Sequence, residues 1–308
     1  MDQDPKRKYH QPVMTKEIVE LFEPIEGGVL VDATYGGGGH SAALLAAYPD
    51  LEIIGIDRDS DALRNSAPAR VELVQSAFSS LDEILDDLSI PEIVGALFDL
   101  GVSGHQLDDP ARGFSYRSSG PLDMRMGPDA AHSAEEIVNE WSKRDLVETI
   151  ARYGEERFAS RIAAAIIAAR PITDTLVLAD VVKNAIPAAT RRTGGHPAKR
   201  TFQAIRIAAN GELAELTDGL TAALRRLAPG GRCVVISYHS LEDRIVKRMF
   251  RDQAQGCTCP PEFPECRCGN TPVVRLIGRK PLRPSEDEVE ENPRARSAKV
   301  RTVEKVAA

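Results

Sequence analysis

Three short apolar runs, each ending in an aspartate, constrain the fold of this 308-residue chain more than any other feature. They cover Gly28–Asp32, Leu51–Asp57 and Ile93–Asp99, and each has the length and continuity of a buried strand. Helix-like segments separate them, which predicts a parallel sheet with helices on both faces. Because ligands bind such sheets at the carboxyl ends of the strands, we expect Asp32, Asp57 and Asp99 to share one functional edge.

The remaining pattern predicts further sheet elements around a helical middle part. We expect a third strand at Val71–Gln75 and later strands at 232–238, 272–277 and 299–303. Helices are predicted at 41–47, 59–65, 81–88, 142–153, 156–169, 176–185 and 241–253, and across 197–227 with a break near Asn210 and Gly211. Ser133 and Glu136 fit a capping box that opens another helix. The segments 101–129 and 284–296 are predicted loops, and 229–231 a turn.

Four consecutive glycines, Gly36–Gly39, follow the first predicted strand and allow a ligand to approach the main chain. A dinucleotide-binding loop has a third glycine where this chain has Ser41. S-adenosylmethionine carries no phosphate, and Asp32 suits its ammonium group, either directly or through the loop. Asp57 can accept both ribose hydroxyls of either cofactor. The glycines therefore indicate a nucleoside cofactor, with a tight turn lacking any ligand as the alternative.

Two later strand ends carry groups that suit transfer to an amine. An exocyclic amine of a nucleobase is a poor nucleophile, so an acceptor such as Asp99 and rigid alignment would assist its attack. The next strand ends at Ser237, Tyr238 and His239, on the same edge. Any of these three could contact the substrate. The alternative is strand-end packing with a helix cap at Ser240.

Composition narrows the setting of the protein. The net charge of −7 argues against non-specific coating of nucleic acid, and no apolar run approaches the roughly 20 residues that span a bilayer. We therefore expect a cytoplasmic protein without membrane contact. Cys233 lies in an apolar run, whereas the other cysteines cluster at 257–268, where they would be reduced or metal-bound. No metal site is assigned, and the oligomeric state, including a homodimer, stays open.

Several motifs together make the sequence resemble the bacterial 16S rRNA cytosine-N4 methyltransferases, the RsmH (MraW) family. They run in family order from about His10 to Lys305 and comprise 36–40, 99–106, 120–126, 196–206, 237–244 and 292–299. The family usually has serine where this chain has Gly104. The cysteine cluster occurs only in some members, and its C-x-C spacing is tighter than the usual C-x₂-C of zinc sites.

The resemblance implies transfer of a methyl group from S-adenosylmethionine to N4 of a cytidine in the decoding region of 16S rRNA, within the small (30S) ribosomal subunit. It implies a class I methyltransferase fold, Rossmann-like with about seven mostly parallel strands, over 1–110 and 198–308, with an inserted helical substrate-recognition domain at 111–197. The implied cofactor contacts are Gly38, Gly39, His40, Asp57, Phe78, Asp99 and Gln106.

We expect direct displacement at the methyl group, with Asp99, Tyr238 and His239 as candidate catalytic residues. Basic residues Arg191, Arg192, Lys199 and Arg200 would meet the rRNA. Two other functions stay open at this point. One is a nicotinamide-dependent Rossmann oxidoreductase, and the other is a non-catalytic RNA-binding assembly factor.

Overall fold

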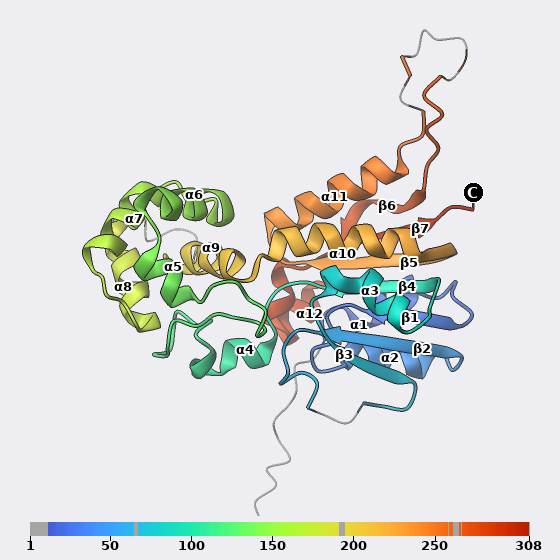
Figure 1. The fold of residues 1–308 in the computed structure, drawn as a ribbon, viewed down its shortest axis with the longest axis horizontal. Coiled ribbons are helices and arrows are strands. Elements are labelled where there is room, and N and C mark those ends of the chain that lie inside the picture. The colour runs from blue at the N-terminus through green and yellow to red at the C-terminus, as the bar shows by residue number, and fades with distance from the viewer. Residues whose placement is uncertain are drawn as a thin grey trace, which may run out of the picture. The chain divides into compact units, whose positions relative to one another are not determined.

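The computed structural model describes residues 12–64, 67–190, 195–257, 259–260, 265 and 267–307. The chain forms two compact units, which Figure 1 draws as ribbons. The sheet unit comprises Met1–Gly101 and Leu213–Ala308, and the helical unit comprises Val102–Glu212. The helical unit thus extends beyond the inserted domain expected at 111–197 on both sides.

Seven strands form one sheet in the described part of the sheet unit, in the order β3-β2-β1-β4-β5-β7-β6. Neighbours pair in parallel from β3 to β5, whereas β7 is antiparallel to both β5 and β6. The strands are β1 (Gly28–Asp32), β2 (Leu51–Asp57), β3 (Val71–Gln75), β4 (Ile93–Asp99), β5 (Leu227–Ser237), β6 (Val274–Leu282) and β7 (Lys299–Lys305). The predicted α/β architecture with a mostly parallel sheet is confirmed.

Helices cover both faces of this sheet (Figure 1). One face packs against α3 (Leu81–Asp87), α10 (Glu212–Arg226) and α11 (Ser240–Ala254), and the other against α1 (Thr15–Leu21) and α2 (Gly39–Ala47). Alternate strand residues serve the two faces, so Val31 joins the first core and Leu30 the second. This continuous burial explains why the strands are apolar runs rather than alternating ones.

The helical unit has an apolar core of its own, built largely from alanine and isoleucine. Its helices are α4 (Gly104–Asp108), α5 (Ala134–Glu140), α6 (Lys143–Gly154), α7 (Ala159–Ala168), α8 (Thr175–Ala185) and α9 (Lys199–Asn210), with a 3₁₀ turn at Pro110–Arg112. The capping box predicted at Ser133 and Glu136 is present. The break near Asn210 is also confirmed, because Gly211 ends α9 with a φ of 63°.

Three local predictions are wrong, each for a recognisable reason. Residues 59–64 form turns rather than a helix, because the carboxylates of Asp57 and Asp59 accept the backbone N–H groups two residues ahead. The predicted loop at 101–129 contains α4. The predicted loop at 284–296 contains α12 (Glu286–Glu291), which Ser285 caps, followed by a 3₁₀ turn at Pro293–Ser297.

The turn predicted at 229–231 lies within β5, which begins at Leu227. The register between β4 and β5 shifts at this point, and Gly230 has a φ of 81°. The glycines therefore create an irregularity in the strand rather than a separate turn before it.

Candidate active site

The glycine loop, Ala33–Gly38, connects β1 to α2 and has little room for side chains. Gly36 and Gly38 have φ angles of 53° and 70°, which favour glycine. A Cβ atom on Gly38 would collide with the hydroxyl of Tyr35, and one on Gly39 would lie 2.8 Å from Cγ of Pro12. The loop thus brings its main chain to the carboxyl edge of the sheet with no side chain at these two positions.

Asp32 lies beneath this loop and fixes it. Its carboxylate is buried, accepts a hydrogen bond from Ser41 Oγ at 2.6 Å, and accepts another from the Thr34 backbone N–H at 3.3 Å. Burial raises the pKa of Asp32, although the hydrogen bond from Ser41 opposes the shift. Asp32 therefore holds the glycine loop in place by accepting these hydrogen bonds. Ser41, at the position of the third glycine in a dinucleotide-binding loop, is a hydrogen-bond donor to Asp32.

Asp57, at the end of β2, is held by two backbone donors, one on each carboxylate oxygen. Gly36 N donates to Oδ2 and Asp59 N donates to Oδ1, both at 2.8 Å. Burial raises the pKa of Asp57 to about 6, although these two donors partly offset the shift. Each carboxylate oxygen can accept a second hydrogen bond. The group is therefore fixed in position and chemically able to receive a pair of hydroxyls.

Asp99 ends β4, and its side chain is about one-quarter exposed. The hydroxyl of Tyr238 donates to its Oδ1 at 2.7 Å, and its own backbone N–H donates to Thr34 Oγ1 at 2.6 Å. Burial, and then the neighbouring Asp99, raise the pKa of Tyr238 well above its ordinary value. Tyr238 therefore stays protonated and keeps Asp99 oriented as a hydrogen-bond acceptor.

His40, in the first turn of α2, has a buried ring with unusual surroundings. Its Nε2 lies 3.5 Å from Asp99 Oδ2, and neither ring nitrogen has a hydrogen-bond partner among the described residues. Burial lowers the pKa of His40, but Asp99, Asp32 and Glu288 outweigh it and raise the pKa overall. A buried ring whose nitrogens make no hydrogen bond is costly, so the site suits a ligand that carries polar groups.

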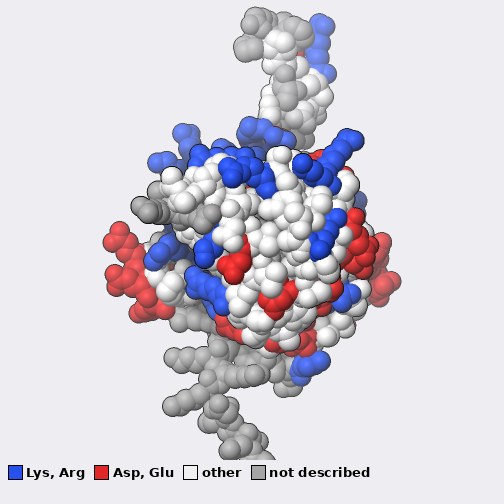
Figure 2. Space-filling view, turned by 90° about the vertical axis from the view of Figure 1, so that its left-hand side faces the viewer, with Lys and Arg blue, Asp and Glu red and all other residues white. Residues whose placement is uncertain are grey.

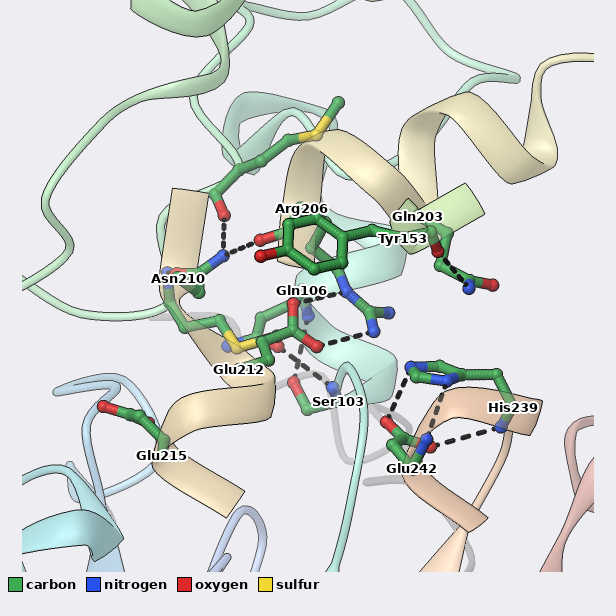
Figure 3. Close-up of polar contacts among 12 residues, drawn as sticks. Ser103, Gln106, Tyr153, Gln203, Arg206, Asn210, Glu212, Glu215, His239 and Glu242 are labelled. Atoms are coloured by element: carbon green, nitrogen blue, oxygen red, sulfur yellow. Dashed lines mark hydrogen bonds and ion pairs between the residues drawn. The ribbon is translucent and has the colours of Figure 1, made fainter. Parts of the chain in front are cut away.

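Phe78 and Gln106, two residues implied by the resemblance, have structural contacts in their own units. The ring of Phe78 packs edge-on against Phe98 at 5.6 Å, and a Cβ atom on Gly219 would lie 2.6 Å from it. Gln106 belongs to the helical unit, where it forms a capping box with Ser103 at the start of α4 (Figure 3). Its Oε1 accepts the Ser103 backbone N–H at 3.0 Å.

His239 caps α11, one residue before the position considered in the alternative interpretation of this segment. Its Nδ1 accepts the Glu242 backbone N–H at 3.3 Å, and its Nε2 lies 2.9 Å from Glu242 Oε1. Figure 3 shows the two side chains facing each other. Glu242 Oε2 also accepts the backbone N–H groups of Tyr238 and His239. The alternative of a helix cap at Ser240 is thus wrong in its position, and the imidazole fixes the β5–α11 turn from which Tyr238 extends.

The amino-acid sequence matches one family of known proteins along nearly the whole chain. Residues 7–306 fit the model of the MraW methylase family. The chain belongs to the MraW methylase family. A protein from Heliobacterium modesticaldum is 49% identical over 309 residues, covering 97% of this chain and 99% of the relative. One from Geotalea uraniireducens is 50% identical over 308 residues, with the same coverage. Both relatives carry the name "Ribosomal RNA small subunit methyltransferase H".

The sheet of this methylase has the strand order β3-β2-β1-β4-β5-β7-β6, and its carboxyl edge uses several residues that the sequence did not reveal. Thr34 links the loop after β1 to Asp99, and Glu242 fixes the backbone at Tyr238. Glu288 accepts the Met14 backbone N–H at 2.5 Å and acts electrostatically on His40 and Tyr238. A capping pattern at Ser285 could have revealed the helix carrying Glu288, but no local signal connects it with distant Met14.

Proposed function

We propose that this methylase transfers a methyl group from S-adenosylmethionine to the exocyclic N4 of a cytidine in the decoding region of 16S rRNA, on the small ribosomal subunit. The observation that carries the proposal is the near-complete match to relatives named small-subunit rRNA methyltransferases. The assignment of rRNA as the substrate rests on the names of these relatives. The assignment of cytidine N4 as the methylated atom rests on the sequence motifs.

The residues of the sheet edge fit the proposed cofactor. Gly38, Gly39 and His40 would hold its amino-acid end, because the loop exposes main chain there and the nitrogens of the buried imidazole make no hydrogen bond among the described residues. Asp57 would accept the ribose hydroxyls on its two positioned oxygens. Phe78 and Asp99 complete the residues of the sheet unit that we assign to the cofactor, and the assignment of Gln106, in the helical unit, rests on the sequence motifs alone. When bound, S-adenosylmethionine supplies an activated methyl group for direct displacement by the target amine.

Asp99 is the residue that we assign to bind the target amine. A carboxylate that accepts an N–H hydrogen bond raises electron density on the nitrogen and aligns its lone pair. Tyr238 acts on this carboxylate by donating to Oδ1 and leaves Oδ2 on the side of His40. His239 would act through the turn that it caps, because both ring nitrogens face Glu242. Asp99 is thus the candidate catalytic residue, and Tyr238 and His239 position it.

The helical segment 111–197 and the start of α9 would recognise rRNA. Exposed basic side chains gather on α6, α7 and α9 and beside them: Lys143, Arg144, Arg152, Arg157, Arg161, Lys199 and Arg200. Figure 2 shows most Lys and Arg in the upper half of the face drawn there, with acidic groups at its sides and in its lower middle part. Arg191 and Arg192 lie outside the described residues. A local basic patch of this kind suits recognition of a folded RNA particle by shape.

The two alternative functions are less favoured. Ser41 is committed to Asp32 beneath the loop, so a pyrophosphate there would face a buried carboxylate instead of a third glycine. A non-catalytic assembly factor would have no need for the Thr34–Asp99–Tyr238 contacts.

In the described part of the chain, no helix is long and apolar enough to cross a membrane. We expect the enzyme to act in the cytoplasm, where small subunits are assembled.

The decisive experiment is transfer of a tritiated methyl group from S-adenosylmethionine to small subunits from cells that lack the enzyme. We expect label on one cytidine of the decoding region, as N4-methylcytidine in nucleoside analysis. Label at carbon 5, on another nucleotide, or on no RNA would contradict the proposal. A thermal-shift series with S-adenosylmethionine, S-adenosylhomocysteine and NAD tests the cofactor separately, and stabilisation by NAD alone would overturn that assignment.

A further inference from the structure

The loop between α11 and β6 is here named the cysteine loop (Gln255–Val273). None of those of its residues that the structure describes is buried. Figure 1 draws its described parts extending away from the ends of α11 and β6. The conformational entropy lost on ordering a loop of this length must be offset by something other than burial of side chains.

Three thiols converge within this loop. The Sγ atoms of Cys257, Cys259 and Cys268 lie within 4.8 Å of one another, and those of Cys257 and Cys268 are 3.8 Å apart. A disulfide requires about 2.05 Å, so none of the three is oxidised to another. Tetrahedral zinc with Zn–S bonds of about 2.3 Å places its sulfur ligands about 3.8 Å apart. The separation of Cys257 and Cys268 is therefore that of two ligands on one zinc ion.

Backbone N–H groups point at all three sulfurs. Cys259 N donates to Cys257 Sγ at 3.4 Å, Arg267 N to Cys259 Sγ at 3.2 Å, and Asn270 N to Cys268 Sγ at 3.5 Å. Donors of this kind stabilise thiolate charge and orient metal ligands from outside the coordination sphere. The Asn270 amide also donates to the carbonyls of Gln255 and Gly256, which joins the two ends of the loop.

We propose that Cys257, Cys259 and Cys268 bind a structural zinc ion that holds the cysteine loop together. Soft thiolates exclude magnesium and calcium and select zinc among the redox-inert ions of the cell. Cys266 lies outside the described residues, and the proposal rests on the other three cysteines. The site involves none of the residues assigned to methyl transfer, so it stands or falls independently of the proposed function.

Elemental analysis of the full chain, purified without added metal or reductant, tests the site directly. We expect close to one equivalent of zinc per chain, and a loss of most of it in Cys257→Ser and in Cys268→Ser. Cys233→Ala is the matched control, because this buried thiol lies in the sheet core, and it should keep its zinc. Absence of zinc in the natural chain, iron in its place, equal zinc in all variants, or a disulfide among the three cysteines would overturn the proposal.

Limited proteolysis supplies a readout that needs no activity. Arg267 is an exposed trypsin site inside the loop, and its backbone N–H is bound to Cys259 Sγ. A strong chelator, or Cys257→Ser, should accelerate cleavage after Arg267 by about tenfold or more, because local opening controls access to the site. Circular dichroism should show that the rest of the protein stays folded. An unchanged cleavage rate after complete removal of zinc would show that the ion does not order the loop.

Discussion

The glycine loop and the cysteine loop belong to the same unit and use the same kind of contact, a side chain that accepts backbone N–H groups. In the glycine loop the acceptors are Asp32 and Asp57, which strands β1 and β2 hold in place. In the cysteine loop the acceptors belong to the loop itself, and no described residue there is buried. The fold therefore fixes the first loop before any ligand binds, whereas the second depends on an ion.

This preorganisation has an energetic cost at Asp57. Its pKa of about 6 in the folded chain lies above the ordinary value of 3.8. A carboxyl group with a raised pKa binds protons more tightly in the folded state, so stability decreases as the pH rises between these two values. At neutral pH the ionised carboxylate costs about 3 kcal/mol. Hydroxyl groups of a ligand that donate to Asp57 would offset part of that cost. The carboxylate is therefore fixed in position before the ligand binds but still has hydrogen bonds to accept.

The largest expected effect is loss of methyl transfer in Asp99→Ala. If the sheet edge is fixed by the fold, removal of this carboxylate should lower the single-turnover rate about 100- to 1,000-fold, because alignment of the amine is lost. Cofactor binding, measured by calorimetry, should change much less. Asp50→Ala removes an exposed carboxylate of the same unit and serves as the control. Full activity in Asp99→Ala would refute the role assigned to this residue.

Asp57→Ala should weaken cofactor binding by about 10- to 100-fold, the value of one or two hydrogen bonds to a charged acceptor. Isothermal titration with S-adenosylmethionine measures it. Glu52→Ala is the matched control, because Glu52 is an exposed carboxylate on the same strand. Equal affinities in the two variants would mean that Asp57 only shapes the loop.

Cofactor affinity should decrease as the pH falls through about 6, because the protonated Asp57 carboxyl accepts hydrogen bonds poorly. Below that pH the dissociation constant should rise by up to about tenfold per unit. His40 also titrates near the site, with a raised pKa, so Asp57→Asn provides the comparison. This variant should bind weakly and show a flatter profile. An equally steep profile in Asp57→Asn would assign the titration to His40.

Ser41→Ala tests how firmly the fold fixes the glycine loop. Removal of the hydroxyl leaves the buried Asp32 carboxylate with one fewer donor, which should cost about 1–3 kcal/mol of stability. Thermal unfolding measures this loss, with the exposed Ser60→Ala as control. An unchanged unfolding temperature would show that the hydrogen bond from Ser41 to Asp32 does not stabilise the folded chain.

The smallest effect is expected from Cys257→Ser, which should leave the methyl-transfer rate within about twofold of the natural chain, as for an independent site. The same tritium assay measures it, on protein whose zinc content has been determined. Parallel loss of zinc and of transfer would show that the two loops are coupled.

Sequence alone located the strands of the sheet better than anything else. The bounds of β1 to β4 agree with those expected. For β1, β2 and β4 the reason is that each strand is largely buried and ends in an aspartate at the ligand edge. Hydrophobic pattern could not reveal the turns at Asp57 and Asp59, where side chains compete with helical hydrogen bonds.

The site was predicted only in part, because its contacts join distant segments. That Asp99 and Tyr238 share an edge follows from strand order, but their hydrogen bond depends on the turn that His239 caps. A serine-to-glutamine capping pattern at Ser103 and Gln106 was readable and was overlooked. The contact between Glu288 and Met14 spans 274 residues and could not have been inferred from local sequence.

The position of β7 between β5 and β6 has a consequence for biosynthesis. While residues 227–298 have left the ribosome and 299–305 have not, β5 has an open edge and β6 lacks its neighbour in the sheet. A chain stalled at that stage would expose two unpaired strand edges, which favour association with other chains. The sheet can therefore close only after β7 has been synthesised. A product that terminates before β7 should be recognised by proteases and chaperones.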